Sequence, residues 1–315
     1  MKSSTTTKNR SPVILLFGPT AVGKTELLSE LFENKGEIIS ADSMQVYRGT
    51  DIGSAKPSPE LIKRLPHHLL DILDINEQFT TGDFVRMADI AVPGILSRNR
   101  VPVISGGTAF YFKNFLYGLP PLPEVQPEWR NRLNREADKN GLINLYHQLE
   151  KADPETAARL PVTDRSRIIR ALEVYYGTGK RLSEFPLPNK IRERYCYLVI
   201  GLFREKEELN QRINERVSQM FRRGLFNEIK NLLKNGAEPD FPAMQGIGYK
   251  EFFEWRKEGC LSVNDLMERI SKNTRHYAKR QMTFFRTIPL VQWVPADNRE
   301  RIKSLISSFL DKNGF

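Results

Sequence analysis

Two hydrophobic patterns alternate along the chain. Short apolar runs rich in β-branched residues predict strands, and longer segments with the helical period predict helices between them. The expected strands are Val13–Phe17, Glu37–Ser40, Val101–Ser105, Cys196–Leu202 and Leu290–Val294. The expected helices include Lys24–Glu33, Gly82–Asn99, Glu207–Asn235 and Arg299–Lys312. Because the strand runs are apolar without clean alternation, we expect parallel strands covered on both faces, and therefore an α/β fold with a parallel-sheet core.

The middle of the chain follows a different pattern. It has helical periodicity at Glu128–Asn140, Leu142–Lys151 and Asp164–Gly177 and no convincing strand. Prolines flank this region at Pro120, Pro121, Pro123 and Pro127 and again at Pro186 and Pro188. Because proline-rich boundaries carry few contacts, we predict a helical insertion domain over 126–194, able to move relative to a core made of 11–125 and 195–315.

The composition excludes several classes of protein. In 315 residues, 20 Gly and 19 Pro are near average usage, which argues against collagen-like and low-complexity chains. The longest apolar runs, Pro12–Phe17 and Leu198–Phe203, are far shorter than the ~20 residues that span a bilayer, so we expect no membrane segment. Cys196 and Cys260 have no CxxC spacing, and the polar start MKSSTTTKNR lacks the apolar stretch of a signal peptide. These features predict a cytoplasmic protein without structural zinc or disulfides.

The charge balance favours an anionic partner. Lys and Arg total 48 against 38 Asp and Glu, which gives a formal net charge of +10. A charge of this sign attracts nucleic acid, phosphorylated small molecules or an acidic membrane surface, although it is also compatible with solubility alone.

One segment has the pattern of a phosphate-binding loop. The pattern GxxxxGK[ST] is matched by Gly18, Pro19, Thr20, Ala21, Val22, Gly23, Lys24 and Thr25. These residues lie between the first expected strand and the first expected helix, which is the context that supports a P-loop. The glycines let the backbone approach phosphate oxygens, Lys24 supplies a positive charge, and the Thr25 hydroxyl is a candidate Mg²⁺ ligand.

The expected sheet places a carboxylate near this loop. Asp42 follows the second expected strand, whereas Val101–Ser105 runs into Gly106-Gly107-Thr108 without the Asp that holds Mg²⁺ in many ATPases. The carboxyl ends of parallel strands converge, so Asp42, Thr108 and the P-loop are expected in one pocket. Asp42 there suits a general base, although Asp is also a residue type of turns and helix caps, and Gly106-Gly107-Thr108 could equally form a plain turn. A small-metabolite kinase and an RNA-binding ATPase remain alternative functions.

Several longer motifs, in order along the chain, resemble those of the tRNA dimethylallyltransferases. The resemblance runs from Pro12 to about Val294 and is carried by GPTAVGKT (Gly18–Thr25), ADSMQVYRGTDIGSAKP (Ala41–Pro57), PHHLLDI (Pro66–Ile72), SGGTAFYFKNFLYGL (Ser105–Leu119), DRSRIIRALEVYYGTGKRLSE (Asp164–Glu184), MQGIGYKE (Met244–Glu251) and TRHYAKRQMTFFR (Thr274–Arg286). It implies transfer of a dimethylallyl group from dimethylallyl diphosphate to the exocyclic amine of the adenosine 3′-adjacent to the anticodon, with release of diphosphate. The absence of the zinc finger that many eukaryotic members carry favours a bacterial-type member, expected as a monomer.

The same resemblance implies roles for individual residues. The P-loop would hold the donor diphosphate with Lys24 and with Mg²⁺ near Thr25, Asp42 would be the general base, and Thr108 would contact the reacting centre. Arg212 and Arg216, one helical turn apart, are further candidates for the diphosphate. The expected tRNA contacts are Asp42, Ser43, Met44, Gln45, Arg130, Ser166, Arg167, Ile168, Ile169, Arg170, Gln245, Gly246, Ile247, Gly248, Tyr249, Lys250, Arg275, Lys279, Arg280 and Gln281.

Two of these stretches also have a simpler interpretation. Arg167 and Arg170 share a helical face that, without the resemblance, reads as a solvated charged surface. The basic segment Arg269–Arg286 contains no acidic residue and suits single-stranded RNA. Its aromatic residues are better interpreted as core than as stacking platforms, and Met282 and Phe285 indicate a buried side of a helix.

Overall fold

The computed structural model describes residues 10–259 and 262–315, so Cys260 and residues 1–9 of the polar N-terminal segment lie outside the described residues. The chain divides into two compact units. One combines the residues up to Leu116 with Arg192–Phe315, and the other is Tyr117–Ile191. The sequence pattern places the corresponding insertion at 126–194.

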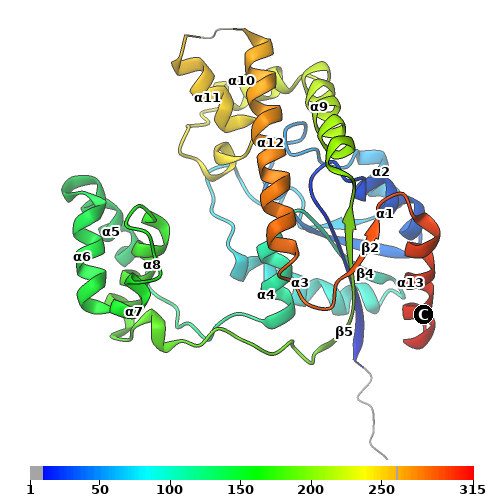
Figure 1. Ribbon diagram of the computed structural model, residues 1–315, viewed down its shortest axis with the longest axis horizontal. Coiled ribbons are helices and arrows are strands. Elements are labelled where there is room, and N and C mark those ends of the chain that lie inside the picture. Colours follow the sequence, from blue (N-terminus) through cyan, green and yellow to red (C-terminus); the bar gives the residue numbers. More distant parts are fainter. Residues whose placement is uncertain (1–9, 260–261) are drawn as a thin grey trace, which may run out of the picture. The chain divides into compact units, whose positions relative to one another are not determined.

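A six-stranded sheet forms the centre of the first unit (Figure 1). Its order is β3-β2-β4-β1-β5-β6 and every pairing is parallel. The strands are β1 (Ser11–Phe17), β2 (Gly36–Ala41), β3 (His67–His68), β4 (Val101–Gly106), β5 (Tyr195–Phe203) and β6 (Gln292–Pro295). The α/β class and the expected strands are confirmed, with ends that differ by one or two residues.

The other elements of the first unit are helices, some packed against the sheet and some against other helices. They are α1 (Lys24–Phe32), α2 (Pro59–Arg64), α3 (Thr81–Leu96), α4 (Ala109–Tyr117), α9 (Lys206–Arg222), α10 (Leu225–Lys234), α11 (Tyr249–Lys257), α12 (Val263–Phe285) and α13 (Arg299–Lys312), with a short 3₁₀ turn at Pro242–Gln245. The single helix expected over Glu207–Asn235 is wrong. Two helices occupy this segment, because Gly224 takes a φ of +101° that ends α9 and starts α10.

The central strand shows why the pattern was so apolar. Ile14 and Leu16 of β1 join a buried cluster with side chains of α1, α9 and α13. On the other face, Phe17 stacks on Phe285 of α12 with ring centroids 4.4 Å apart and meets Phe112 of α4 edge-on. Both faces of β1 are therefore buried against helices, as expected for a parallel sheet between helical layers. This packing also brings the carboxyl end of α12 against the sheet.

The second unit is helical. It contains α5 (Pro127–Asn140), α6 (Leu142–Ala152), α7 (Pro154–Ala157), α8 (Arg165–Thr178) and a 3₁₀ turn at Leu182–Glu184. The helices enclose their own hydrophobic core, which includes Leu133, Leu145, Leu149 and Leu172. Within the described ranges, no helix of either unit is long and apolar enough to cross a membrane.

Candidate active site

The P-loop connects β1 to α1 and is shaped by contacts on its carbonyl groups. Gly23 has a φ of +106° and Ala21 a φ of +61°, a left-handed conformation that curls the loop. A Cβ on Gly18 would lie 2.7 Å from the carbonyl oxygen of Leu202, so only glycine fits there. The loop backbone therefore requires glycine at Gly18 and favours it at Gly23.

Three cationic side chains hold the loop carbonyls. The Lys24 Nζ donates to the carbonyls of Gly18 and Pro19, each at 2.9 Å. The Nε atoms of Arg212 and Arg204 donate to the carbonyls of Ala21 and Val22, also at 2.9 Å. Because a carbonyl and the next amide point in opposite directions across a planar peptide, the contact on Val22 turns the Gly23 amide away from Arg204. Arg204 has no motif of its own and was not predicted.

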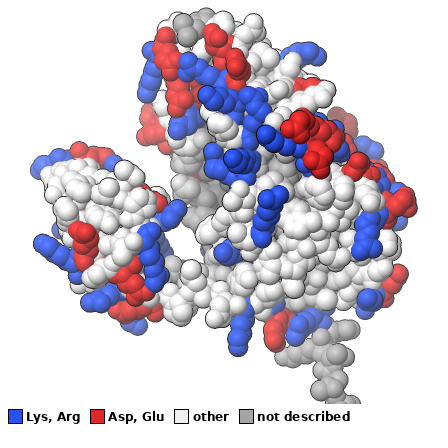
Figure 2. Space-filling view, in the orientation of Figure 1, with Lys and Arg blue, Asp and Glu red and all other residues white. Residues whose placement is uncertain are grey.

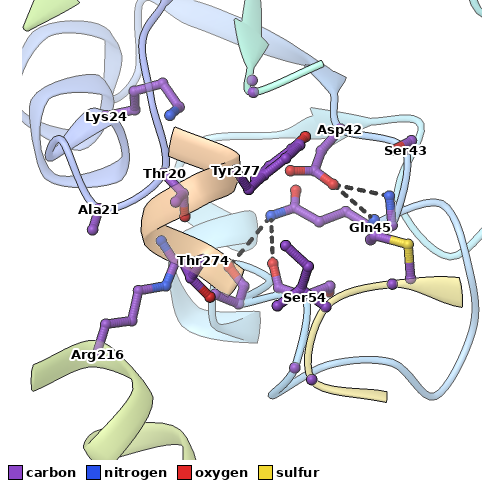
Figure 3. A pocket seen from close by; sticks show the side chains of 18 of the residues that line it. Thr20, Ala21, Lys24, Asp42, Ser43, Gln45, Ser54, Arg216, Thr274 and Tyr277 are labelled. Carbon is purple, nitrogen blue, oxygen red and sulfur yellow. Dashed lines mark hydrogen bonds between the residues drawn. The ribbon is translucent and has the colours of Figure 1, made fainter. Parts of the chain in front are cut away.

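A cavity of about 840 Å³ opens beside this loop. Its wall combines the P-loop with the ends of β2 and β4, with α9 and with α12 (Figure 3). Asp42 and Lys24 both line it, as the sequence predicts, and so does Arg216 from α9. Thr108 lies one contact behind the wall, where its Oγ1 accepts a hydrogen bond from the Ser43 amide at 3.0 Å.

The electrostatics of the cavity favour an anion at the loop end. Desolvation, reinforced by the charge of Arg216, lowers the pKa of Lys24 to about 7. Desolvation also lowers the pKa of Arg216, although Asp42 and Glu26 oppose the shift. Burial destabilises the charged forms of both Lys24 and Arg216. An anionic group bound between them would stabilise both charges.

Asp42 occupies a turn at the end of β2. Its Oδ1 accepts hydrogen bonds from the amides of Met44 at 2.9 Å and Gln45 at 3.4 Å (Figure 3). The turn interpretation is therefore correct for this oxygen, and the residue also lines the cavity. These two observations are compatible, since one carboxylate oxygen fixes the side chain while the group as a whole faces the cavity.

Gln45 is held at both ends of its amide. Its Nε2 donates to the carbonyls of Ser54 and Ala55, each at 3.3 Å, and its Oε1 accepts from the Ser40 hydroxyl at 3.0 Å. The side chain lies beside Asp42 in the cavity wall (Figure 3).

Helix α12 contributes two cavity residues, Tyr277 and Gln281, whose contacts in the cavity the sequence did not indicate. Tyr277 lies beside Asp42, and burial together with that carboxylate raises its pKa to about 12 (Figure 3). Gln281 was expected to contact RNA, but it is only 5% exposed. Its Oε1 accepts from the Thr20 amide at 2.9 Å and its Nε2 donates to the Gly107 carbonyl at 2.7 Å, so it joins the P-loop to the loop after β4.

Other residues of α12 form a basic surface. Lys279 and Arg280 are exposed and Arg275 is half-buried, with its Nη1 donating to Asn214 at 2.5 Å. Figure 2 shows Lys and Arg side chains gathered over this helix. Phe285 is fully buried, as expected. The helix therefore presents Tyr277 and Gln281 to the cavity and Lys279 to solvent, while the exposed Arg280 also lines the cavity.

The segment 245–250 is only partly accessible. Gln245 and Lys250 are exposed, whereas Tyr249 is fully buried and cannot offer its ring to RNA. A Cβ on Gly246 would overlap the Met44 side chain, and Gly248 has a φ of +101°, so both glycines serve the local packing. Ile247 is partly buried at the cavity wall.

In the helical unit, burial separates the predicted RNA contacts on α8. Ser166 and Arg167 are exposed, whereas Ile168 and Ile169 are 0% and 4% exposed and belong to the unit's core. The expectation that these two isoleucines contact RNA is corrected, because the helical period turns them inward.

Two further cations of this unit share one partner. Arg130 and Arg170 each lie 2.9 Å from the buried carboxylate of Glu173. The shared buried carboxylate joins α5 to α8 and fixes the direction of both guanidinium groups. Arg170 is thus held in place, whereas Arg167 is exposed and pairs with Asp164, at 3.1 Å.

The chain is similar to known transferases along nearly all of its length. The family model described as IPP transferase matches residues 45–288. A tRNA dimethylallyltransferase of Geobacter sulfurreducens is 44% identical over 305 residues, which cover 96% of this chain and 97% of that protein. One of Borreliella burgdorferi is 42% identical and covers 93% of this chain and 96% of its own.

Solved structures agree with the sequence relatives. A full-length tRNA isopentenylpyrophosphate transferase from Bacillus halodurans superposes with a TM-score of 0.68 at 35% identity, covering 96% of this chain and 98% of that one. A eukaryotic dimethylallyltransferase acting on tRNA gives a TM-score of 0.76 at 29% identity and covers 95% of this chain and 77% of that one.

Proposed function

The chain belongs to the IPP transferase family, and we propose that it is a tRNA dimethylallyltransferase that prenylates the exocyclic amine of the adenosine 3′-adjacent to the anticodon. The observation that carries the proposal is the single cavity in which a P-loop, two destabilised cations and Asp42 meet. Such a cavity suits an anionic leaving group at one end and, at the other, a nucleophile that loses a proton to Asp42.

The donor diphosphate is assigned to the P-loop end. As the bond from the allylic carbon to its oxygen breaks, negative charge accumulates on the diphosphate and positive charge spreads over the allyl group. Lys24 and Arg216 would stabilise the departing anion, and the aromatic face of Tyr277 suits the allylic cation. The amine nitrogen donates the electron pair that forms the new C–N bond to the allylic carbon, and Asp42 accepts the proton that the amine loses.

The residues present also fit a divalent cation bound together with the diphosphate. The Ser105 Oγ is buried in the cavity wall and has no hydrogen-bond partner in the described structure. The described ranges contain no cluster of three His, Cys, Asp or Glu suited to a metal. A site with the Thr25 hydroxyl, phosphate oxygens and water is the type that Mg²⁺ prefers. When bound, Mg²⁺ would neutralise charge on the diphosphate.

The activity test follows product formation directly. Labelled dimethylallyl diphosphate is incubated with tRNA that carries adenosine beside the anticodon, and with the same tRNA carrying guanosine there. The proposal expects label in the first tRNA only, and mass spectrometry of the nucleosides should find prenylated adenosine. ATP-dependent phosphorylation of a small molecule without prenyl transfer would support the kinase alternative, and RNA-stimulated ATP turnover the ATPase.

Diphosphate binding should be coupled to protonation of Lys24. The free site holds the pKa of Lys24 near 7, and a bound anion raises it. At a pH between the pKa of Lys24 in the free site and its pKa in the bound site, binding takes up a proton. The affinity for pyrophosphate should therefore fall as the pH rises above 7. Calorimetry at pH 8 in buffers of different ionisation enthalpy should show about one more proton taken up by wild type than by Lys24→Arg. Equal uptake by the two proteins would contradict the assignment.

The basic surface of α12 should contribute to tRNA affinity. We expect the double variant Arg275→Ala and Lys279→Ala to weaken tRNA binding and to reduce the slope of log affinity against log salt by about 0.7–1 per lost phosphate contact. The charge-matched control is Arg301→Ala with Lys312→Ala on α13, both exposed. Identical slopes for the two double variants would place the RNA elsewhere.

A further inference from the structure

A single carboxylate on α10 holds the turn 51–53. The Glu228 side chain accepts hydrogen bonds from the amides of Asp51 at 2.8 Å, Ile52 at 2.6 Å and Gly53 at 3.0 Å. The hydroxyl of Tyr249 on α11 donates to the same carboxylate at 2.7 Å. Four donors therefore converge on one anion, and hydrogen bonds to an ionised acceptor are the strong ones.

The turn also rests on the ring of Tyr249. This side chain is fully buried, and a Cβ on Gly53 would lie 2.5 Å from its ring carbon and hydroxyl oxygen. Burial and the neighbouring Glu228 raise the pKa of Tyr249, so the hydroxyl remains protonated and continues to donate. The turn is thus fixed both by hydrogen bonds and by contact of its backbone with an aromatic face.

The residues that follow this turn hold Gln45. The carbonyls of Ser54 and Ala55 accept hydrogen bonds from the side-chain Nε2 of Gln45. The backbone amide of Gln45 donates to Asp42. A continuous set of contacts therefore runs from α10 and α11 through the turn to the two polar side chains at the acceptor end of the cavity.

A second anchor lies within the same segment. The Nζ of Lys56 is buried, donates to the Tyr47 carbonyl at 2.6 Å and pairs with Asp51 at 2.8 Å and with Asp71. If Lys56 alone sufficed, loss of the contact from α11 would have no effect on the cavity. This alternative defines the comparison that the experiment must make.

We propose that Glu228 and Tyr249 are positioning residues for the acceptor base. They hold the turn 51–53, and through the following Ser54 and Ala55 they keep Gln45 and Asp42 facing the target adenine. Glu228 and Tyr249 themselves do not touch the reacting atoms. The inference rests on the proposed function, because the acceptor is taken to be the tRNA adenosine. It assigns the buried Tyr249 a role different from the RNA contact that its motif suggested.

The test compares two tyrosines that each donate to a carboxylate. Tyr249→Phe removes one donor without changing the packing volume. Tyr195→Phe is the matched control, because the Tyr195 hydroxyl donates to Asp89 at 2.9 Å and neither residue lines the cavity. In single-turnover reactions with saturating substrates, Tyr249→Phe should lower the prenyl-transfer rate about tenfold, the effect of losing one hydrogen bond to a charged group. Tyr195→Phe should react like wild type.

Binding and amide exchange separate positioning from general loosening. Dissociation constants for pyrophosphate and for tRNA should change less than about twofold in Tyr249→Phe, while the amides of 51–53 should exchange hydrogen faster than in wild type. Glu228→Gln should show the same pattern more strongly, and Glu228→Asp should recover part of the rate.

Three results would overturn the inference: equal rates for the two tyrosine variants, weakened pyrophosphate binding in Tyr249→Phe, or unchanged exchange at 51–53. The failure of the proposed function is distinguishable, because wild type itself would then transfer no prenyl group. In that case the amide exchange of the turn decides by itself whether Glu228 and Tyr249 hold it.

Discussion

Asp42→Asn should lower the rate of prenyl transfer by about 10²–10⁴-fold, the usual contribution of a general base. Asparagine keeps the side-chain oxygen that accepts from the Met44 and Gln45 amides, so the turn at the end of β2 should survive. What disappears is the negative charge that accepts a proton from the adenine amine. Single-turnover kinetics at saturating donor and tRNA measure this step without a contribution from binding.

Binding measurements serve as the internal control for this variant. Affinity for tRNA should stay within about twofold of wild type, and affinity for pyrophosphate should not weaken, because a carboxylate near the cations Lys24 and Arg216 has been removed. Asp83→Asn provides a matched variant, since Asp83 completes the capping box of α3 with Thr80 and lies outside the cavity. A nearly normal rate for Asp42→Asn would reduce Asp42 to a turn cap.

The fold was largely predictable because its strands are buried on both faces. An apolar run such as β1 has few alternatives once helical segments flank it, and its position in the sheet centre explains why no polar residue interrupts it. Strand β3 was missed because it consists only of His67 and His68. The break at Gly224 was missed because the amphipathic period continues on both sides of it.

The site was predictable only where its residues form a contiguous motif. The P-loop and Asp42 are read from short sequences that follow β1 and β2, whose carboxyl ends lie at the same edge of the sheet with β4 between them. The functions of Tyr277 and Gln281 depend instead on which side of α12 faces the cavity. Gln281 bonds to the backbone of Thr20 and Gly107, which lie 261 and 174 positions away. Backbone groups leave no signal in a sequence, so this contact required the structure.

Replacing Gln281 with leucine should damage the donor site rather than the RNA surface. The change leaves the Gly107 carbonyl without its partner in a buried position and the Thr20 amide without its partner in a partly buried one. An unsatisfied buried group costs about 1–3 kcal/mol, so we expect a loss of about 1–3 kcal/mol from the Gly107 carbonyl and a smaller loss from the Thr20 amide, which lies at the cavity wall. The P-loop should lose its fixed position, and pyrophosphate should bind about 10–100-fold more weakly, which calorimetry measures alongside thermal unfolding.

The comparison with tRNA binding decides between the two interpretations of this glutamine. If Gln281 contacted RNA, as its motif suggested, Gln281→Leu would weaken tRNA binding and leave pyrophosphate binding and stability unchanged. Gln211→Leu on α9 is the matched control, because its amide is exposed and bonds only locally, to Glu215 at 3.0 Å. A buried link between two loops of the cavity wall predicts the opposite result. The affinity for tRNA is retained, whereas the affinity for the diphosphate and the stability of the fold decrease together.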